Sequence, residues 1–555
     1  MREKAFTGAR LRTRWVLPAV LALVAATGGT LAEGVPAQGG TAHDPALVRT
    51  ANGPVRGTVT ATYPEFDGIP YAAPPVGPLR WQPPRPAAHW STPRDATTPA
   101  SVCAQPDLAP YTPGGSEDCL YLNVTTPRHQ TGQPLPVMLW FHGGGFSAGS
   151  GIETRPTELA PLGNVIVVTI NYRLGAFGYL DLPQLDAGLG AGKSGNFGLE
   201  DQQAAMRWVR DNAAAFGGDP RNVTLFGQWT GGRIACVQLT APGSAGLFDK
   251  VITMSNPCLL NRVPNVDGSF NPNPLGLPQS RADAEGHGEQ FASDIGCTDP
   301  ATVVACLRGK STDQIVAKAP MLQMTPVFGG GGPLPVDPIT AFRTGHFAKV
   351  PMLEGVNKDA YRTSEAVLEE YGFPTLTPDT YVDTVRNFAG KDADRVLARY
   401  PLSAYPSPTL AWATLATDAL LARPLLDTTV AFQRQVPLYT YEFADPNTPW
   451  YADIPKPSFP TGSFQDGELQ YLFDTTYFAG RTLTPQQQDL AMAMMCYFAA
   501  FAHDSNPNVP GLPYWPRANQ RPGQAQALAP AGAGGIRQVD FAKEHNYDLW
   551  HTIPY

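Results

Sequence analysis

Six short apolar runs recur along the chain and alternate with segments of helical pattern. They are "PVMLWF" (136–141), "NVIVVTINY" (164–172), "NVTLF" (222–226), "KVITMS" (250–255), "VPMLEG" (350–355) and "PLYTYEF" (437–443). Strands that are apolar throughout are typical of a parallel sheet covered on both faces. Residues 200–216 place Ala205, Trp208, Val209, Ala213 and Phe216 on one helical face. The alternation predicts an α/β fold with a central, mostly parallel sheet flanked by helices.

A second helix is predicted near the end of the chain. Thr484 and Pro485 supply an N-cap and a first-turn proline for "QQQDLAMAMMCYFAAFAH" (486–503). This helix is apolar on most sides, so we expect it to be buried. Two proline- and glycine-rich stretches, residues 261–280 and 523–535, have neither period nor charge and are expected to form surface loops.

Residues 1–37 have the pattern of a secretory signal peptide. Five basic residues between Arg2 and Arg14 precede the apolar run "WVLPAVLALVAA", and "VPA" ending at Ala37 offers a cleavage site. The run is too short to anchor the protein across a bilayer. We therefore expect a secreted protein whose mature chain, residues 38–555, is one large domain without a membrane span.

Composition and charge limit the classes of partner. The chain has 555 residues, 43% of them hydrophobic, and a formal net charge of -8, which gives no basic field for nucleic acid. The glycine run "FGGGGP" (328–333) lacks the lysine of a phosphate-binding loop, and no metal-ligand spacing is present. We expect no cofactor, no metal and no nucleic-acid partner. The sequence indicates no protein partner or oligomeric state.

The seven cysteines suit an oxidising compartment. Cys103 with Cys119, and Cys297 with Cys306, are close enough in sequence to close small surface loops. Cys236, Cys258 and Cys496 are left over. Because two of these three lie in apolar helical patterns, we expect buried free thiols.

The stretch "GQWTG" (227–231) joins the run at 222–226 to a helix that begins near Gly231. Gly227 and Gly231 frame Trp229 as the glycines of G-x-S-x-G frame the serine of a nucleophile elbow. Glycines are needed there because the turn brings backbone segments too close together for a Cβ atom. Trp229 stands where the serine belongs and has no nucleophilic oxygen.

The chain resembles the type-B carboxylesterase and cholinesterase-like family of α/β-hydrolases from about Val48 to Trp515. The matching blocks include "SEDCLYLNV" (116–124), "WFHGGGFSAGS" (140–150), "VVTINYRLGAFGYL" (167–180), "GNFGLEDQQAAMRWVRDNAAAFGGDPRNVTLFG" (195–227), "PMLEGVNKD" (351–359), "GELQYLFD" (467–474) and "FAHDSNPN" (501–508). The resemblance implies the α/β-hydrolase fold and disulfides between Cys103 and Cys119 and between Cys297 and Cys306.

The same resemblance places the catalytic triad at Trp229, Ala360 and Gln465, where the family has serine, glutamate and histidine. Tryptophan cannot act as the nucleophile, alanine cannot orient a base, and glutamine cannot act as the general base. Loss of one triad member typically costs on the order of 10^4 to 10^6 in turnover, so the acyl-enzyme route should be closed. The resemblance assigns the oxyanion-hole donors to the backbone N–H groups of Gly144, Gly145 and Thr230, which do not depend on the missing side chains.

Three functions remain open on this basis. In the first, the pocket binds an apolar ester, lactone or polycyclic carbonyl compound and promotes cyclisation, elimination or isomerisation. In the second, the protein binds a ligand or a partner without turnover. In the third, substitute residues hydrolyse a carboxylic ester. Because Trp229 adopts a strained turn where a smaller residue would suffice, we expect its indole to pack on the pocket walls or on a ligand.

The polar residues near the lost triad have simpler interpretations. Thr230 is expected to cap its helix, and Asp359 and Asp466 to accept loop N–H groups. Glu468 is expected to be a scaffold residue, and His142, as the resemblance implies, to shape the oxyanion loop. Glu200 and Asp201 are expected to act as cap and network residues.

Overall fold

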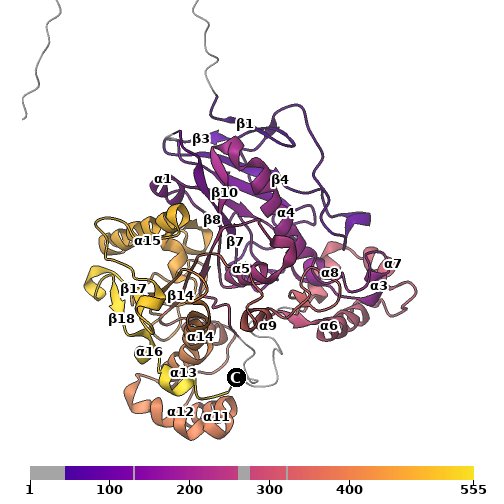
Figure 1. Ribbon diagram of the computed structural model, residues 1–555. Helices are drawn as coiled ribbons and strands as arrows, with labels where there is room; N and C mark the ends of the chain where they lie inside the picture. The colour runs from indigo at the N-terminus through magenta and orange to yellow at the C-terminus, as the bar shows by residue number, and fades with distance from the viewer. Residues whose placement is uncertain (1–43, 129–131, 261–275, 321–322, 555) are drawn as a thin grey trace, which may run out of the picture. The chain divides into compact units, whose positions relative to one another are not determined.

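An eleven-stranded sheet forms the centre of the molecule (Figure 1). The computed structural model describes residues 44–128, 132–260, 276–320 and 323–554, and Pro45–Tyr555 forms one compact unit. The signal peptide expected at residues 1–37 lies outside the described residues. In spatial order the strands are β18 (Arg537–Val539), β17 (Ala525–Leu528), β15 (Leu438–Phe443), β14 (Met352–Asn357), β11 (Lys250–Met254), β10 (Gly218–Gln228), β7 (Leu135–Phe141), β9 (Ile166–Ile170), β6 (Tyr121–Thr125), β4 (Pro64–Pro70) and β3 (Thr58–Val59).

The sheet is parallel from β17 to β9 and antiparallel at both ends. All six predicted apolar runs are strands of its parallel part, so the prediction of a mostly parallel sheet is confirmed. Because helices cover both faces of a parallel sheet, strand residues are buried on either side, and β7 is buried at each of its positions.

Alternate residues of the central strands face two different apolar cores. On β7, Val137 and Leu139 join a cluster with α4 (Phe197–Asn212) and α5 (Thr230–Thr240), while Met138 and Trp140 join one with α15 (Pro485–Asp504). The α1 helix (Leu159–Gly163) lies with α15. Two helices predicted from the sequence therefore lie on opposite faces of the sheet. The α15 helix begins as predicted, with Thr484 as N-cap and Pro485 in the first turn.

The remaining elements surround these layers. The other helices are α2 (Gly175–Tyr179), α3 (Pro183–Asp186), α6 (Arg281–Asp294), α7 (Val303–Arg308), α8 (Thr312–Lys318), α9 (Pro338–Arg343), α10 (Arg362–Glu370), α11 (Pro378–Ala389), α12 (Ala393–Arg399), α13 (Pro408–Thr417), α14 (Arg423–Phe432), α16 (Phe541–Glu544) and α17 (Tyr547–Trp550). Short strands are β1 (Leu47–Thr50), β2 (Gly53–Arg56), β5 (Arg94–Asp95), β8 (Thr154–Arg155), β12 (Gln279–Ser280), β13 (Val327–Phe328) and β16 (Asp474–Thr475). Within the described ranges, no helix is both long and apolar enough to cross a membrane.

The prediction of a surface loop at residues 523–535 is wrong in part. Residues 525–528 of the stretch 523–535 form β17, a fully buried strand between β15 and β18. The alanine-rich segment has weak strand propensity, and its pairing with β15 decides its conformation. In the other stretch, residues 261–275 lie outside the described residues and Gln279–Ser280 form β12.

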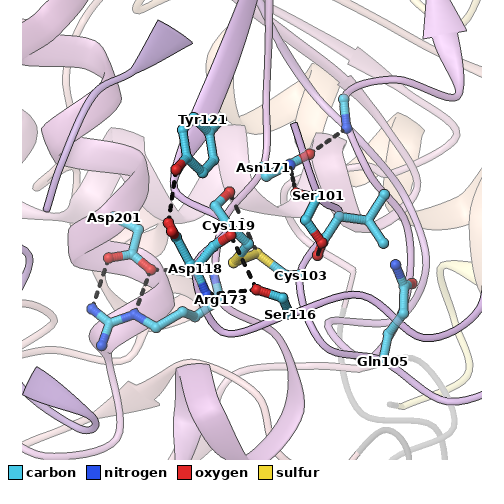
Figure 2. Close-up of a disulfide and its surroundings, with 12 residues drawn as sticks. Ser101, Cys103, Gln105, Ser116, Asp118, Cys119, Tyr121, Asn171, Arg173 and Asp201 are labelled. Atoms are coloured by element: carbon cyan, nitrogen blue, oxygen red, sulfur yellow. Dashed lines mark hydrogen bonds and ion pairs between the residues drawn. A yellow bond between two sulfur atoms is a disulfide. The ribbon is translucent and has the colours of Figure 1, made fainter. Parts of the chain in front are cut away.

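The structure contains three disulfides. Cys103–Cys119 (Figure 2) and Cys297–Cys306 form as expected. The expectation of free thiols is wrong for Cys236 and Cys258, which form a third disulfide with a Cα–Cα distance of 5.3 Å. Cys236 lies on α5 and Cys258 follows β11, so only the packing of α5 against the sheet brings them together. Cys496 is free and half-buried.

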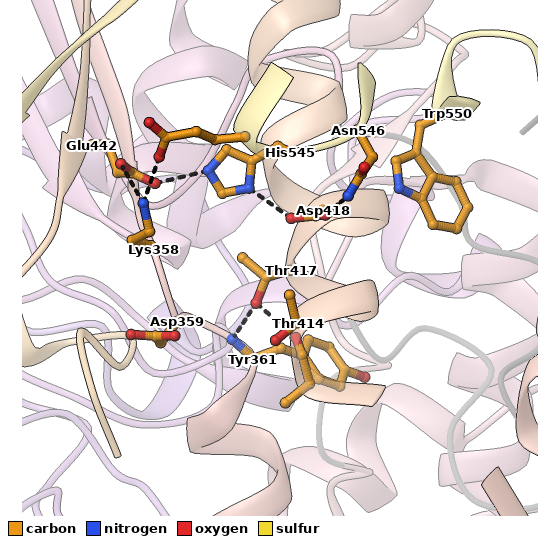
Figure 3. Close-up of polar contacts among 12 residues, drawn as sticks. Lys358, Asp359, Tyr361, Thr414, Thr417, Asp418, Glu442, His545, Asn546 and Trp550 are labelled. Carbon is orange, nitrogen blue, oxygen red and sulfur yellow. Dashed lines mark hydrogen bonds and ion pairs between the residues drawn. The ribbon is translucent and has the colours of Figure 1, made fainter. Parts of the chain in front are cut away.

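A buried cluster of charged side chains attaches the C-terminal segment to the sheet (Figure 3). His545 contacts Asp418 through Nδ1 at 2.6 Å and Glu442, on β15, through Nε2 at 2.7 Å. Lys358 lies 3.5 Å from Glu442 and 2.6 Å from Glu544. Although burial opposes the charged form, the two carboxylates raise the pKa of His545 to about 10. The imidazolium therefore joins α16 and α17 to the rest of the domain at neutral pH.

This cluster makes stability depend on pH through His545. Its folded-state pKa is above the unfolded value, so the stabilisation is fully present below about pH 6.5 and is lost as pH rises toward 10. We expect the free energy of unfolding to fall with rising pH more steeply for the wild type than for His545→Gln. The two slopes should differ by up to about 1.4 kcal/mol per pH unit. Urea unfolding at pH 6 to 10 measures the difference, and parallel pH profiles would contradict the assignment.

Candidate functional site

The turn between β10 and α5 has the geometry of a nucleophile elbow. Trp229 has φ 48° and ψ -109°, a conformation that L-residues rarely adopt. A Cβ atom on Gly227 would lie 2.4 Å from the carbonyl carbon of Gly231, and one on Gly231 would lie 1.8 Å from the carbonyl oxygen of Phe141. Both glycines are therefore required by close backbone contact, and the turn forms with Trp229 at its centre.

Trp229 is partly buried and packs against a cluster of apolar residues. The cluster includes Leu260, Leu277, Ala360 and Leu425. The backbone N–H of Trp229 donates to the carbonyl of Met254 at 2.9 Å. A positive φ costs a non-glycine residue about 1 to 3 kcal/mol, and burial of the indole offsets part of that cost.

The fold brings the other two replaced positions together. Ala360 follows β14 and is buried, and its carbonyl accepts the backbone N–H of Gln465 at 3.4 Å. Ala360 also belongs to the cluster that Trp229 contacts. The Gln465 side chain makes no hydrogen bond to a described residue. Ala360 and Gln465 are thus neighbours, and among the described residues no hydrogen bond joins the side chains of Trp229, Ala360 and Gln465.

Carboxylates beside these positions are held by side chains. Asp466 accepts hydrogen bonds from the Gln228 amide and, at 2.6 Å, from the Tyr451 hydroxyl, so the expectation that it accepts loop N–H groups is wrong. Its left-handed backbone, with φ 75°, turns the carboxylate toward β10. Glu468 accepts from Ser255 at 3.0 Å and Asn357 at 2.5 Å.

Burial shifts the acidity of both groups. It raises the pKa of Asp466 above its usual range and, together with the nearby Asp466 charge, raises the pKa of Glu468 to about 7. Asp359 differs, because its carboxylate accepts the N–H of Ser463 at 2.9 Å, as expected for a loop residue, and pairs with Arg362 at 2.6 Å.

Thr230 changes the oxyanion hole. Its hydroxyl oxygen accepts the backbone N–H of Gly145 at 2.8 Å, inside the protein. The expectation that this hydroxyl caps its own helix is wrong, since α5 has no side-chain cap bond. The N–H groups of Gly144 and Thr230 have no acceptor among the described residues. Of the three backbone N–H groups that the resemblance assigns to an oxyanion hole, that of Gly145 is thus bonded to Thr230, and the other two have no acceptor among the described residues.

His142 lies beneath the glycine loop in a structural role. Its ring stacks on Tyr172 with centroids 4.3 Å apart, and Nδ1 donates to the carbonyl of Gly143 at 2.8 Å. Burial lowers the pKa of His142 to about 4, so the ring is neutral at pH 7. A neutral, stacked imidazole holds the loop and carries no charge to the site.

The acidic residues of α4 belong to the scaffold. Asp201 forms a two-pronged ion pair with Arg173, with both contacts at 2.7 Å, close to the Cys103–Cys119 disulfide (Figure 2). Glu200 lies in the first turn of α4, and burial raises its pKa to about 7. Asp201 is therefore a network residue, as expected from the sequence, whereas Oε2 of Glu200 is buried without a hydrogen-bond partner among the described residues.

Sequence reasoning missed two polar features of α5. The hydroxyl of Thr230 was assigned to helix capping, and Arg233 was not noticed, although a single arginine in the apolar segment "TGGRIACVQL" (230–239) is a visible signal. Arg233 is buried one turn along α5 from the elbow and donates to the side chain of Asn256 at 2.6 Å.

The Thr230–Gly145 bond should contribute to stability. Thr230→Val keeps the shape of the side chain and removes the acceptor, which leaves a buried N–H group unsatisfied. We expect the free energy of unfolding to fall by about 1 to 3 kcal/mol, with Thr230→Ser close to wild type. Urea unfolding of the three proteins tests this, and equal stability of the valine variant would contradict the assigned bond.

The chain is similar in sequence and in fold to known carboxylesterases. A family model described as "Carboxylesterase family" matches residues 44–550. Cocaine esterase from Homo sapiens is 32% identical over 522 residues, which cover 87% of this chain and 86% of that protein. Para-nitrobenzyl esterase from Bacillus subtilis (strain 168) is 32% identical over 487 residues, 85% of this chain and 92% of that protein. A solved thermophilic PNB esterase structure has a TM-score of 0.71 and 28% identity, and covers 91% of this chain and 100% of its own. The chain therefore belongs to the carboxylesterase family and has the α/β-hydrolase fold.

Proposed function

We propose that this protein binds an apolar carbonyl compound at the former catalytic site and does not hydrolyse it. The observation that carries the proposal is the combination of a blocked nucleophile position with a partly retained oxyanion hole. Trp229, Ala360 and Gln465 offer no nucleophile, no orienting acid and no base, while the N–H groups of Gly144 and Thr230 stay unpaired. Two backbone donors can hold a carbonyl oxygen without activating water against it.

The ligand class follows from the family and from the walls of the site. The relatives carry the names of ester hydrolases, so an ester, a lactone or a polycyclic carbonyl compound is the ligand that the architecture would accept. The indole of Trp229 adds a broad apolar surface where an acyl-enzyme would otherwise form. It favours a flat or hydrophobic ligand, because apolar contact area is what an indole supplies.

A second candidate is a non-hydrolytic reaction, namely cyclisation, elimination or isomerisation. Asp466 and Glu468 favour it, because burial raises the pKa of both groups and brings that of Glu468 to about 7. A carboxyl group that titrates near neutral pH can take up and return a proton. Hydrogen bonds from Tyr451 and Ser255 hold the carboxylates of Asp466 and Glu468 in place. For this reason, binding without turnover is the first candidate.

An assay of p-nitrophenyl butyrate hydrolysis tests the proposal. We expect the wild type to show no turnover above the uncatalysed rate. The positive control is the variant Trp229→Ser, Ala360→Glu, Gln465→His, which restores the triad. We expect it to hydrolyse the ester, and to do so at least tenfold faster when Thr230→Ala also frees the Gly145 N–H, since one oxyanion donor is typically worth about 10^2 to 10^3.

Wild-type hydrolysis that Asp466→Asn abolishes, and that Asp359→Asn does not, would replace the proposal by a substitute-residue esterase. The two candidates that remain are separated by the fate of the ligand. Mass spectrometry and chromatography after incubation with an aromatic lactone that raises the melting temperature should recover the lactone unchanged. A new isomer or elimination product would establish the second candidate.

We also propose that the protein is exported. The N-terminal pattern and the three disulfides support this, because disulfides persist in oxidising compartments. Expression of the full chain in a secreting host should release a protein whose N-terminus, read by Edman degradation, begins at Gln38. Retention of the uncleaved chain inside the cells would contradict the proposal, and deletion of residues 1–37 is the matched control.

A further inference from the structure

A cavity of about 270 Å³ lies against α5, one turn beyond Trp229. Its walls come from α5, from the segment after β11 and from α9 with the strand β13 before it. The residues that line it include Arg233, Val237, Asn256, Leu260, Phe328 and Phe342. The volume is close to the lower end of the range for small-molecule sites.

Arg233 is the charged group that this cavity exposes. The residue is only 5% exposed, and its guanidinium makes a single hydrogen bond, from Nη2 to the Asn256 side chain at 2.6 Å. No carboxylate of the described residues pairs with it. Asp337 also lines the cavity, but its carboxylate caps α9 by accepting the N–H groups of Ile339 and Thr340.

A buried guanidinium with one acceptor is an incomplete arrangement. The group has five N–H donors and a full charge, and burial of an uncompensated charge is costly. Burial lowers the pKa of Arg233 to about 9, which reflects the same lack of a counter-charge. An anion seated beside Arg233 would supply both the charge and the missing acceptors, and a carboxylate fits the guanidinium fork with two parallel bonds.

The other walls used by the site are apolar. Val237, Leu260, Phe328 and Phe342 face the cavity, and these side chains suit a hydrocarbon or aromatic body. The Cys236–Cys258 disulfide also lines it and fixes α5 to the segment that carries Asn256. The site therefore combines one fixed cationic group with a preformed apolar surface, which is the usual composition of a site for an amphipathic small molecule.

We propose that this cavity binds a medium-chain monocarboxylate, with the carboxylate on Arg233 and the apolar body against Phe328 and Phe342. The site uses no group of the replaced triad. It can be tested separately from the function proposed for the former catalytic site, with which it shares α5 and the apolar side chains of Leu260 and Leu277.

Isothermal titration of the purified protein with octanoate tests the proposal. We expect saturable binding by the wild type and at least tenfold weaker binding by Arg233→Met. Octanol, which has the same chain and no charge, should also bind at least tenfold more weakly than octanoate. The matched control is Arg221→Met, because the Arg221 side chain is 89% exposed and its loss should leave octanoate binding unchanged.

Two further measurements keep the test decisive. Arg233→Met should have an unliganded melting temperature equal to or above that of the wild type, because it removes an unpaired buried charge. Ile339→Trp keeps Arg233 and reduces the volume of the cavity, so it should also weaken octanoate binding. Gln465→Ala should leave octanoate binding unchanged. Absence of octanoate binding to the wild type, or unchanged binding to both Arg233→Met and Ile339→Trp, would overturn the proposal.

Discussion

The close approach of Gly231 to the carbonyl of Phe141 is the contact on which the site depends. A Cβ atom there would lie 1.8 Å from the carbonyl oxygen, so α5 can pack against β7 only with glycine at this position. That contact sets the direction of α5 and the positive φ of Trp229. It also brings Thr230 within hydrogen-bonding distance of Gly145. The turn is a property of the backbone and of its glycines, which explains why it forms with tryptophan at its centre.

Within this fixed frame, the residues beside the elbow are held by packing and by hydrogen bonds. Trp229 lies against the cluster that contains Ala360, and the small side chain at position 360 joins that apolar cluster. Asp466 is tied to Gln228 and Tyr451. Groups that would have to change protonation or position in a hydrolase are held in place here. The polar side chains beside the elbow thus have fixed partners, whereas the backbone N–H groups of Gly144 and Thr230 have no acceptor among the described residues.

Much of the architecture could be predicted because it depends on local patterns. Continuous apolar runs predict buried parallel strands, and the pair Thr484 and Pro485 predicts the start of α15, since capping and periodicity involve residues within one or two turns. The strand β17 was missed for the opposite reason. Its sequence, "AQAL" at 525–528, has little strand propensity of its own, and its pairing with β15 supplies the stabilisation.

The sequence by itself determined the elbow and indicated two of the three disulfides, because each depends on residue type at a recognisable spacing. Only the tertiary structure decided that Cys236 bonds to Cys258, that the Thr230 hydroxyl accepts the Gly145 N–H, and that Arg233 lines a cavity with no carboxylate partner among the described residues. Each of these depends on contacts between segments that are distant in sequence. The packing of α5 on the sheet sets these contacts, and no local sequence pattern encodes them.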